Sequence, residues 1–344
     1  MGQADLQAPD RLLGDVAAAA RLAEGPEGVR RVLRAVFTEG AVPIRDLARQ
    51  VALPIPVVAA VRGELERRGV LERQGGMALT KAGMEAVQRV LGLSCRRRFP
   101  RPLYPSLPAD LSGLLDRMDE ICEGRPGIDV TLDQSHATPE TALRRALYLY
   151  EYDALEGRDV LILGDDDLSS LAVGLLSEFL GLQVRNLVVL ECDGRLVDYL
   201  RSAGAGYPLE AIRHDLRQDL PDELIGRFDV FLTDPPYTLE GLDLFVSRGV
   251  TGLRSGAGKQ GYVCFGHRSP RETAEAVGAL TQMGLAPVEI VPDFNRYVGA
   301  QVLAGISQMI RTISTSDMRP SIQGPYGGAL YTADRKRSRK RHGR

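Results

Sequence analysis

The sequence predicts an α/β protein in which a doubly wound, mostly parallel sheet follows a small α+β module. Between residues 111 and 334, short apolar runs alternate with helical stretches, which is typical of parallel strands covered by helices on both faces. Several of these runs end at acidic or turn-forming residues, as expected where the strands of such a sheet reach a ligand site. Before residue 92 the pattern differs, because helical stretches dominate and only one short hairpin is predicted.

Composition limits the possible classes of protein. The chain has 344 residues, enough for two domains at about 100–200 residues each. Its net charge of −2 implies no strong overall field, and no apolar run approaches the ~20 residues of a membrane span. The N-terminus lacks the apolar core of a signal peptide. The four cysteines have neither zinc-site spacing nor disulfide density, so we expect a cytoplasmic protein.

The first module is expected over residues 11–91. Gly69 and the Gly75-Gly76 pair mark the end of a helix and a hairpin turn, and Thr80 opens a last helix. The order of three helices, a small hairpin and a helix resembles a winged-helix module. The three predicted helices before the hairpin cover 27–37, 43–51 and 56–68, a further helix is expected at 11–24, and the hairpin strands cover 70–73 and 77–80.

Two uses of such a module remain open. Arginines near the hairpin could contact DNA phosphates, namely Arg62, Arg67, Arg68 and Arg73. Glutamates interleave with them, however, which is typical of a solvated helix face, so packing or dimerisation is favoured. Residues 92–110 are rich in arginine and proline, which predicts a stiff linker. Residues 335–344 are predicted to form a disordered basic tail. Nucleic acid is therefore possible but not expected as a substrate.

The first strand of the larger domain, residues 160–163, leads into an unusually acidic turn. Gly164 is followed by Asp165, Asp166 and Asp167, and a helix then covers 168–180. A phosphate-binding turn at this place would be glycine-rich, so that backbone could approach an anion. Three carboxylates would repel a phosphate, and the natural ligand is a cation.

Further strands are predicted with carboxylates at their ends. Glu191 closes the second strand and is the first choice for binding ribose hydroxyls, with Asp193 as the alternative. Asp215 follows the third strand. The strands are expected at 186–191, 211–214, 228–233, 260–265 and 287–291, with further candidates at 307–314 and 329–333.

Asp133 and Gln134 precede a helix expected from residue 139 to about 152. Thr138 is the natural N-cap and Pro139 suits the first helical position, so much of this motif is structural. Asp133 and Gln134 remain free to face a pocket. His136 is one of four histidines, and a lone loop histidine is more often a hydrogen-bonding residue than a base.

Asp234-Pro-Pro-Tyr237, at the end of the fourth strand, is the most specific motif in the chain. Two prolines fix the backbone, so that the Asp234 carboxylate points to a set place. Tyr237 adds an aromatic face for a base or a cationic amine. A carboxylate beside an aromatic wall suits an amine nucleophile, whose proton the carboxylate can accept.

These motifs support a resemblance to known families. The larger domain resembles the Rossmann-like fold of methyltransferases that use S-adenosylmethionine, whose amino-group members carry Asp/Asn-Pro-Pro-Tyr/Phe at this place. Their first turn is glycine-rich, unlike the acidic turn here. The whole set is similar to that of the branched-chain polyamine synthases, which join a winged helix to an aminopropyltransferase domain. It comprises Asp133-Gln134, Thr138–Thr141, Leu163–Leu168, Glu191–Asp193, Thr233–Pro236 and Phe294–Val298.

The resemblance implies transfer of aminopropyl groups from decarboxylated S-adenosylmethionine, a co-substrate, to the secondary amine of spermidine. It implies no bound cofactor, no metal, 5′-methylthioadenosine as the second product, and a homodimer as the expected assembly. Catalysis is assigned to Asp166, Asp167 and Asp234, with Asp166 or Asp234 as proton acceptor. Donor binding is assigned to Gly164, Asp165, Asp167, Glu191, Asp193 and Asp215. Acceptor binding is assigned to Asp133, Gln134, Asp166, Asp234 and Tyr237.

Two other functions stay open at this point. The Asp-Pro-Pro-Tyr motif, the winged helix and the basic tail would also fit an N-methyltransferase acting on nucleic acid or another amine. Alternatively, the α/β domain could only sense a polyamine or nucleoside for a winged-helix regulator. The sequence does not choose between linear and branched acceptors, nor does it give the number of transfers.

Overall fold

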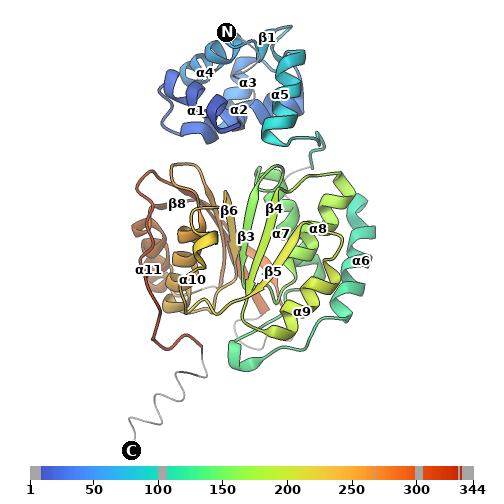
Figure 1. Ribbon diagram of the computed structural model, residues 1–344, viewed down its shortest axis with the longest axis vertical. Helices are drawn as coiled ribbons and strands as arrows, with labels where there is room; N and C mark the ends of the chain where they lie inside the picture. Colours follow the sequence, from blue (N-terminus) through green and yellow to red (C-terminus); the bar gives the residue numbers. More distant parts are fainter. Residues whose placement is uncertain (1–8, 100–106, 267, 299–304, 332–333, 335–344) are drawn as a thin grey trace, which may run out of the picture.

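The computed structural model describes residues 9–99, 107–266, 268–298, 305–331 and 334. A small N-terminal unit lies against one end of a larger unit built on a seven-stranded sheet (Figure 1). The predicted basic tail, 335–344, and residues 100–106 of the predicted linker lie outside the described residues.

The N-terminal unit is mainly helical and contains a two-stranded antiparallel hairpin. It has its own apolar cluster, to which all its helices contribute. Thr80 caps the last helix by accepting from the backbone N–H of Gly83 at 2.9 Å, as the sequence predicts. Its elements are α1 (Pro9–Ala19), α2 (Gly25–Glu39), α3 (Ile44–Val51), α4 (Ile55–Arg67), β1 (Leu71–Arg73), β2 (Met77–Leu79) and α5 (Lys81–Leu91).

The large sheet has the strand order β5-β4-β3-β6-β7-β9-β8. Its first five strands are parallel, and β9 and β8 add an antiparallel edge. The prediction of a mostly parallel, doubly wound sheet is therefore confirmed. The strands are β3 (Asp159–Leu163), β4 (Asn186–Glu191), β5 (Leu209–Arg213), β6 (Val230–Thr233), β7 (Gln260–Gly266), β8 (Leu285–Arg296) and β9 (Ile306–Ser314).

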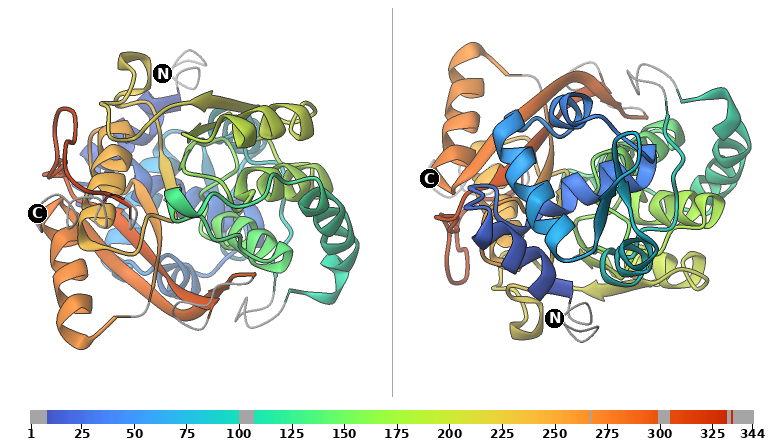
Figure 2. Two further views of the ribbon diagram at one scale, coloured as in Figure 1. Left: turned by 90° about the horizontal axis from the view of Figure 1, so that it is seen from below. Right: turned by 90° about the horizontal axis from the view of Figure 1, so that it is seen from above.

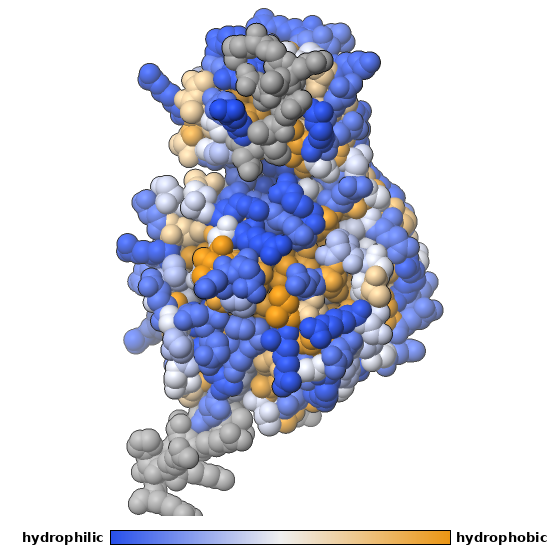
Figure 3. Space-filling model, viewed as in Figure 1, coloured by the Kyte–Doolittle hydropathy of each residue, from blue (hydrophilic) through white to orange (hydrophobic). Residues whose placement is uncertain are grey.

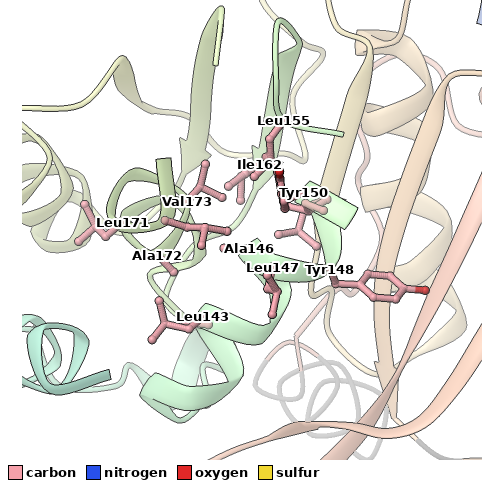
Figure 4. Close-up of a cluster of buried hydrophobic side chains, with 14 of the residues drawn as sticks. Leu143, Ala146, Leu147, Tyr148, Tyr150, Leu155, Ile162, Leu171, Ala172 and Val173 are labelled. Atoms are coloured by element: carbon pink, nitrogen blue, oxygen red, sulfur yellow. The ribbon is translucent and has the colours of Figure 1, made fainter. Parts of the chain in front are cut away.

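Alternate residues of each parallel strand enter two different cores, because successive side chains point to opposite faces. Val160 and Ile162 of β3 pack against α6, α7 and α8, whereas Leu161 and Leu163 pack on the side of α10 and α11. Figure 4 shows the first of these cores, where residues of α7 and α8 meet Ile162. The helices are α6 (Ser112–Glu123), α7 (Pro139–Glu151), α8 (Ser169–Leu180), α9 (Gly194–Ala203), α10 (Leu239–Gly252) and α11 (Pro270–Gln282); short 3-10 turns lie at η2 (Ala109–Leu111), η3 (Val130–Leu132) and η4 (Asp222–Leu224).

One predicted strand, 329–333, is wrong for its described residues 329–331. Leu330 and Tyr331 are buried, but their backbone N–H groups bond to the Asp334 carboxylate rather than to a neighbouring strand. The apolar pattern there reflects packing onto the core on the α10 side. Residues 332–333 lie outside the described residues. The strand expected at 287–291 is also longer than predicted, because β8 continues through two irregularities to Arg296.

Buried ion pairs join the N-terminal unit to the amino ends of the strands. The Arg30 guanidinium binds the Asp153 carboxylate at 2.9 Å, and Arg158 binds Glu27 at the same distance. Lys259, just before β7, binds Glu27 and Asp229, at 2.7 and 2.9 Å. The N-terminal unit thus covers the amino ends of the strands and leaves their carboxyl ends uncovered.

On the face drawn in Figure 3, apolar residues gather in the middle of the larger unit and hydrophilic residues surround them. Within the described ranges, none of the helices has both the length and the apolar character needed to cross a membrane.

Candidate active site

A cavity of about 510 Å³ lies at the carboxyl ends of the parallel strands, the end seen from below in Figure 2 (left). Residues of the turns after β3 and β6, two neighbouring strands, both line it. The chain leaves these two neighbouring strands toward opposite edges of the sheet, which is where doubly wound folds bind ligands. Polar residues on its walls are Asp133, Gln134, Ser135, Asp166, Asp167, Glu191, Cys192, His214, Asp234, Tyr237, Thr238, Arg268, Tyr297 and Tyr331.

The three aspartates after Gly164 have three different environments. Asp165 points away from the cavity and caps α8, accepting from the backbone N–H groups of Ser169 and Ser170 at 2.7 and 3.2 Å. Burial raises the pKa of Asp165 to about 7. Asp165 is expected to contact a ligand, but it caps its own helix instead. A carboxylate at a helix start accepts hydrogen bonds from the backbone N–H groups that have no partner within the helix.

Asp167 is buried and held on both oxygens. Arg145 of α7 donates to one oxygen at 2.6 Å, and the backbone N–H of Ala137 bonds to the other. Burial alone would raise the pKa of Asp167, but Arg145 and these hydrogen bonds outweigh it and lower the pKa. This side chain is therefore an anion whose charge Arg145 largely compensates.

Asp166 faces the cavity and is only partly buried. Its carboxylate accepts from the backbone N–H of Ser135 at 3.2 Å, and no ion pair joins it to a cation among the described residues. The pKa of Asp166 is raised well above its usual range. Desolvation is the largest cause, and repulsion from the carboxylates of Asp167, Glu191 and Asp234 adds to it. Of the three aspartates in this turn, it is the one that lines the cavity without an ion-pair partner among the described residues.

Asp234 opens the Asp-Pro-Pro-Tyr turn after β6 and lies at the centre of a hydrogen-bond network. One oxygen accepts from the Arg145 guanidinium and from the Tyr297 hydroxyl, both at 2.6 Å. The Tyr237 hydroxyl donates in turn to that of Tyr297 at 2.7 Å. Burial raises the pKa of Asp234 to about 6, although Arg145 opposes the shift and Asp167 adds to it.

Arg145 therefore joins the two acidic turns that close β3 and β6. Its side chain is 2% exposed and also donates to Asn295 at 2.8 Å. The sequence patterns predict no role for Arg145, Asn295 or Tyr297. The signal for Arg145 is its place among the apolar residues of a predicted helix. Asn295 and Tyr297 lie in the stretch 294–298, which carries part of the family resemblance.

Glu191, at the end of β4, holds two turns together. It accepts from the backbone N–H groups of Asp165 and Asp193, at 2.9 and 2.8 Å, and lines the cavity. Burial raises the pKa of Glu191. Asp193 does not line the cavity; it caps α9 and binds Arg195 at 2.6 Å.

Asp215 also stays off the cavity wall, since it binds Arg217 at 2.7 Å in the turn after β5. Asp133 and Gln134 do line the cavity, as expected. His136 does not line it, and burial together with Arg125 lowers the pKa of His136 to about 4.

The cavity wall is acidic. Five carboxylates line it, whereas Arg268 is the one lysine or arginine on its described wall, and Arg145 lies behind Asp167 and Asp234. Such an excess of negative charge attracts cations. No group of three or more His, Cys, Asp and Glu side chains within the described ranges could hold a metal ion.

Comparison with known proteins places these motifs in one family. The model of the branched-chain polyamine synthase A C-terminal domain matches residues 113–319. The chain is 36% identical to an uncharacterized protein of Methanocaldococcus jannaschii, over 88% of this chain and 77% of that one. It is 34% identical to the N(4)-bis(aminopropyl)spermidine synthase of Thermococcus kodakarensis, over 78% and 77% of the two chains.

A solved structure agrees. The branched-chain polyamine synthase of Thermus thermophilus, in complex with N4-aminopropylspermidine and 5′-methylthioadenosine, matches 94% of this chain and 98% of its own, with a TM-score of 0.58 and 28% identity. The match extends over the N-terminal unit as well as the sheet. The chain described here belongs to the branched-chain polyamine synthase family.

Proposed function

We propose that this protein is an aminopropyltransferase that moves aminopropyl groups from decarboxylated S-adenosylmethionine to the secondary amine N4 of spermidine. The observation that carries this proposal is the acidic cavity at the ends of β3 and β6, whose wall holds five carboxylates. Both reactants are cations, because the donor has a sulfonium and an ammonium and spermidine is a polyamine. The names of the related synthases agree with this chemistry.

The same charge argues against methyl transfer. Intact S-adenosylmethionine carries a carboxylate, which Asp166 and its acidic neighbours would repel. Loss of that carboxylate removes the repulsion. The acidic turn thus favours the decarboxylated donor over the intact one.

In the proposed reaction, N4 attacks the aminopropyl carbon next to sulfur as the unprotonated amine, because an ammonium has no lone pair. The new C–N bond forms as the C–S bond breaks, and 5′-methylthioadenosine leaves with the bonding electron pair. The N4 proton passes to Asp166, since this carboxylate faces the cavity without an ion-pair partner and its raised pKa suits a base. Asp234 is fixed by Arg145 and Tyr297, so we assign it to orienting the amine.

In a second transfer to the same nitrogen, no proton is left to remove once the tertiary amine is free. Alkylation of this free amine gives a quaternary ammonium. Carboxylates around the cavity and the face of Tyr237 would stabilise that charge. In the same scheme Glu191 binds the ribose, Asp167 lies near the donor's ammonium, and Asp133 and Gln134 lie near the acceptor.

For the whole chain we propose a winged-helix domain over 11–91, a linker over 92–110 and a catalytic domain over 111–334. The separate apolar cluster of the first unit supports this division. The first unit would serve in packing rather than DNA binding, since Arg62 and Arg73 pair with Glu66, and Arg67 and Arg68 pair with Glu64.

We further propose that the enzyme is a cytoplasmic homodimer. Its cysteines are free thiols, as in a reducing compartment. The edge strand β8 exposes Val288 and Ile290, at 46% and 43%, and a second copy could cover them. Light scattering of the purified protein would test the assembly.

Incubation with each donor in turn tests the function. With decarboxylated S-adenosylmethionine and spermidine, mass spectrometry should detect 5′-methylthioadenosine and spermidine enlarged by one or two aminopropyl groups. Methylated product from intact S-adenosylmethionine would point to a methyltransferase instead. Binding of either cation without any product would favour a sensor.

A further inference from the structure

The chain after β9 returns to the cavity from outside the sheet. Residues 321–324 lie against α10, where the Arg248 guanidinium donates to the carbonyl of Gly324 at 2.8 Å. The backbone N–H of Tyr326 bonds to the carbonyl of Arg217 at 2.7 Å. This segment therefore lies fixed against the turn that follows β5.

The segment ends by placing Tyr331 in the cavity wall. The side chain is buried, its hydroxyl lies 3.9 Å from the Cys192 sulfur, and the Arg217 guanidinium lies 5.9 Å from its ring centroid. Asp334 accepts from the backbone N–H groups of Leu330 and Tyr331 at 3.3 and 3.2 Å. The ring is thus held by contacts on several sides.

This end of the cavity has a different character from the acidic turns. Tyr331 lines it with residues from the ends of β4 and β5, including Leu190, Leu216 and His214. Glu191, at the end of β4, also lines the cavity here, whereas the nearby Asp215 binds Arg217 and stays off the wall. An apolar, aromatic wall beside a ribose-binding carboxylate suits a flat, uncharged heteroaromatic ring rather than an ammonium group.

We propose that Tyr331 is a binding residue for the purine ring of the donor, and that Asp334 is a positioning residue that fixes the Tyr331 backbone. This inference rests on the proposed function. It assigns a role to a segment beyond residue 319, where the match to the family model ends.

Binding of 5′-methylthioadenosine, measured by calorimetry, tests the proposal without turnover. Tyr331→Leu keeps a buried apolar side chain but lacks a flat face, so the dissociation constant should rise about tenfold. Tyr331→Phe keeps the ring and should bind within about twofold of the unchanged protein, since only a hydroxyl is lost. The KM for spermidine should stay the same in both.

Asp334→Ala should also raise the dissociation constant for 5′-methylthioadenosine, with no change in the KM for spermidine. The matched control is Asp317→Ala, because Asp317 is exposed on the same segment and contacts only Ser316 in the described structure. If Tyr331→Leu binds the nucleoside as tightly as the unchanged protein, the inference is wrong. An equal loss of nucleoside and spermidine affinity would also overturn it, as this would indicate general damage to the fold. Failure of the unchanged protein to bind the nucleoside would instead count against the proposed function.

Discussion

The carboxylates in and beside the cavity have different neighbours, and these neighbours decide what each carboxylate can do. Asp165 caps a helix, and Asp167 binds Arg145. Asp234 accepts hydrogen bonds from both Arg145 and Tyr297. Asp166 accepts only a backbone N–H at 3.2 Å in the described structure, and other carboxylates surround it. At the scale of single residues, we therefore propose Asp166 as the group that accepts a proton from the substrate.

Replacing Asp166 by Asn should lower kcat by about 10²–10⁴-fold, the usual contribution of a general base. The melting temperature should not fall, because removing one of several like charges relieves repulsion. Steady-state kinetics with spermidine and thermal denaturation measure the two effects. Asp198→Asn is the matched control, since Asp198 is exposed on α9 and away from the cavity. A variant that keeps wild-type kcat would move the base to Asp234.

Affinity for spermidine should fall on acidification. The charged forms of Asp166 and Asp234 bind the spermidine cation. Binding is therefore strong above the raised pKa values of these carboxylates and weakens below them. The spermidine amines stay protonated up to about pH 8, so the cation itself does not change over this range. With the pKa of Asp234 at about 6 and that of Asp166 raised, the dissociation constant should rise between pH 8 and pH 5. Protonation of Asp234 alone accounts for about a tenfold loss at pH 5. Calorimetry at several pH values measures this; a flat profile would mean that neither carboxylate binds the amine.

At the scale of elements, helix α7 supports the acidic turns through a residue that does not line the cavity. Arg145 extends from α7 to the ends of β3 and β6 and to Asn295 of β8. It lies between two neighbouring carboxylates, Asp167 and Asp234, and offsets the repulsion between them. The position of the acidic turns relative to one another thus depends on a single buried guanidinium.

Arg145→Met should destabilise the protein by about 3–5 kcal/mol, because Asp167 and Asp234 would remain buried without their cation. Urea denaturation measures the loss. Adding Asp234→Asn to this variant should recover part of it, since one uncompensated charge is removed. If Arg145→Met is as stable as the unchanged protein, the guanidinium does not hold the two turns together.

At the scale of the whole molecule, buried charges join the N-terminal unit to the sheet. Burial would raise the pKa of Asp153, but Arg30, Arg158 and Arg34 lower it to about 2. A carboxylate with a lowered pKa stabilises the folded state above its ordinary pKa, and that contribution is lost as the pH falls through the lowered value. The attachment of the unit therefore depends on pH only in strong acid.

Acid should release the N-terminal unit between about pH 4 and pH 2. Small-angle scattering would register an increase in the radius of gyration over this range, at a pH where the sheet keeps its circular dichroism. Asp153→Asn should already be less stable at neutral pH, since Arg30 and Arg158 would each lose a carboxylate partner. An unchanged radius down to pH 2 would show that apolar contacts alone hold the unit.

The sequence by itself determined the order of the elements, the acidic turn after the first strand and the Asp-Pro-Pro-Tyr turn after the fourth. These features are local, because hydrophobic period, caps and turn residues act over a few positions. Thr138 as a cap of α7 and the bounds of β4 are examples that the structure confirms. The strand expected at 329–333 is wrong over its described residues 329–331 for the same reason: a short apolar run does not reveal whether it pairs with a strand or packs on a core.

Only the tertiary structure decided which partner each charged residue has. Arg145 and Asp234 lie 89 positions apart in the chain, and Tyr297 and Asp234 lie 63 apart. Their contacts arise because the sheet order places β3 beside β6 and returns β8 to the edge next to β9. Three consecutive aspartates look alike in the sequence, yet in the fold one caps a helix, one binds an arginine and one faces the cavity, since hydrogen-bond partners and burial come from distant parts of the chain.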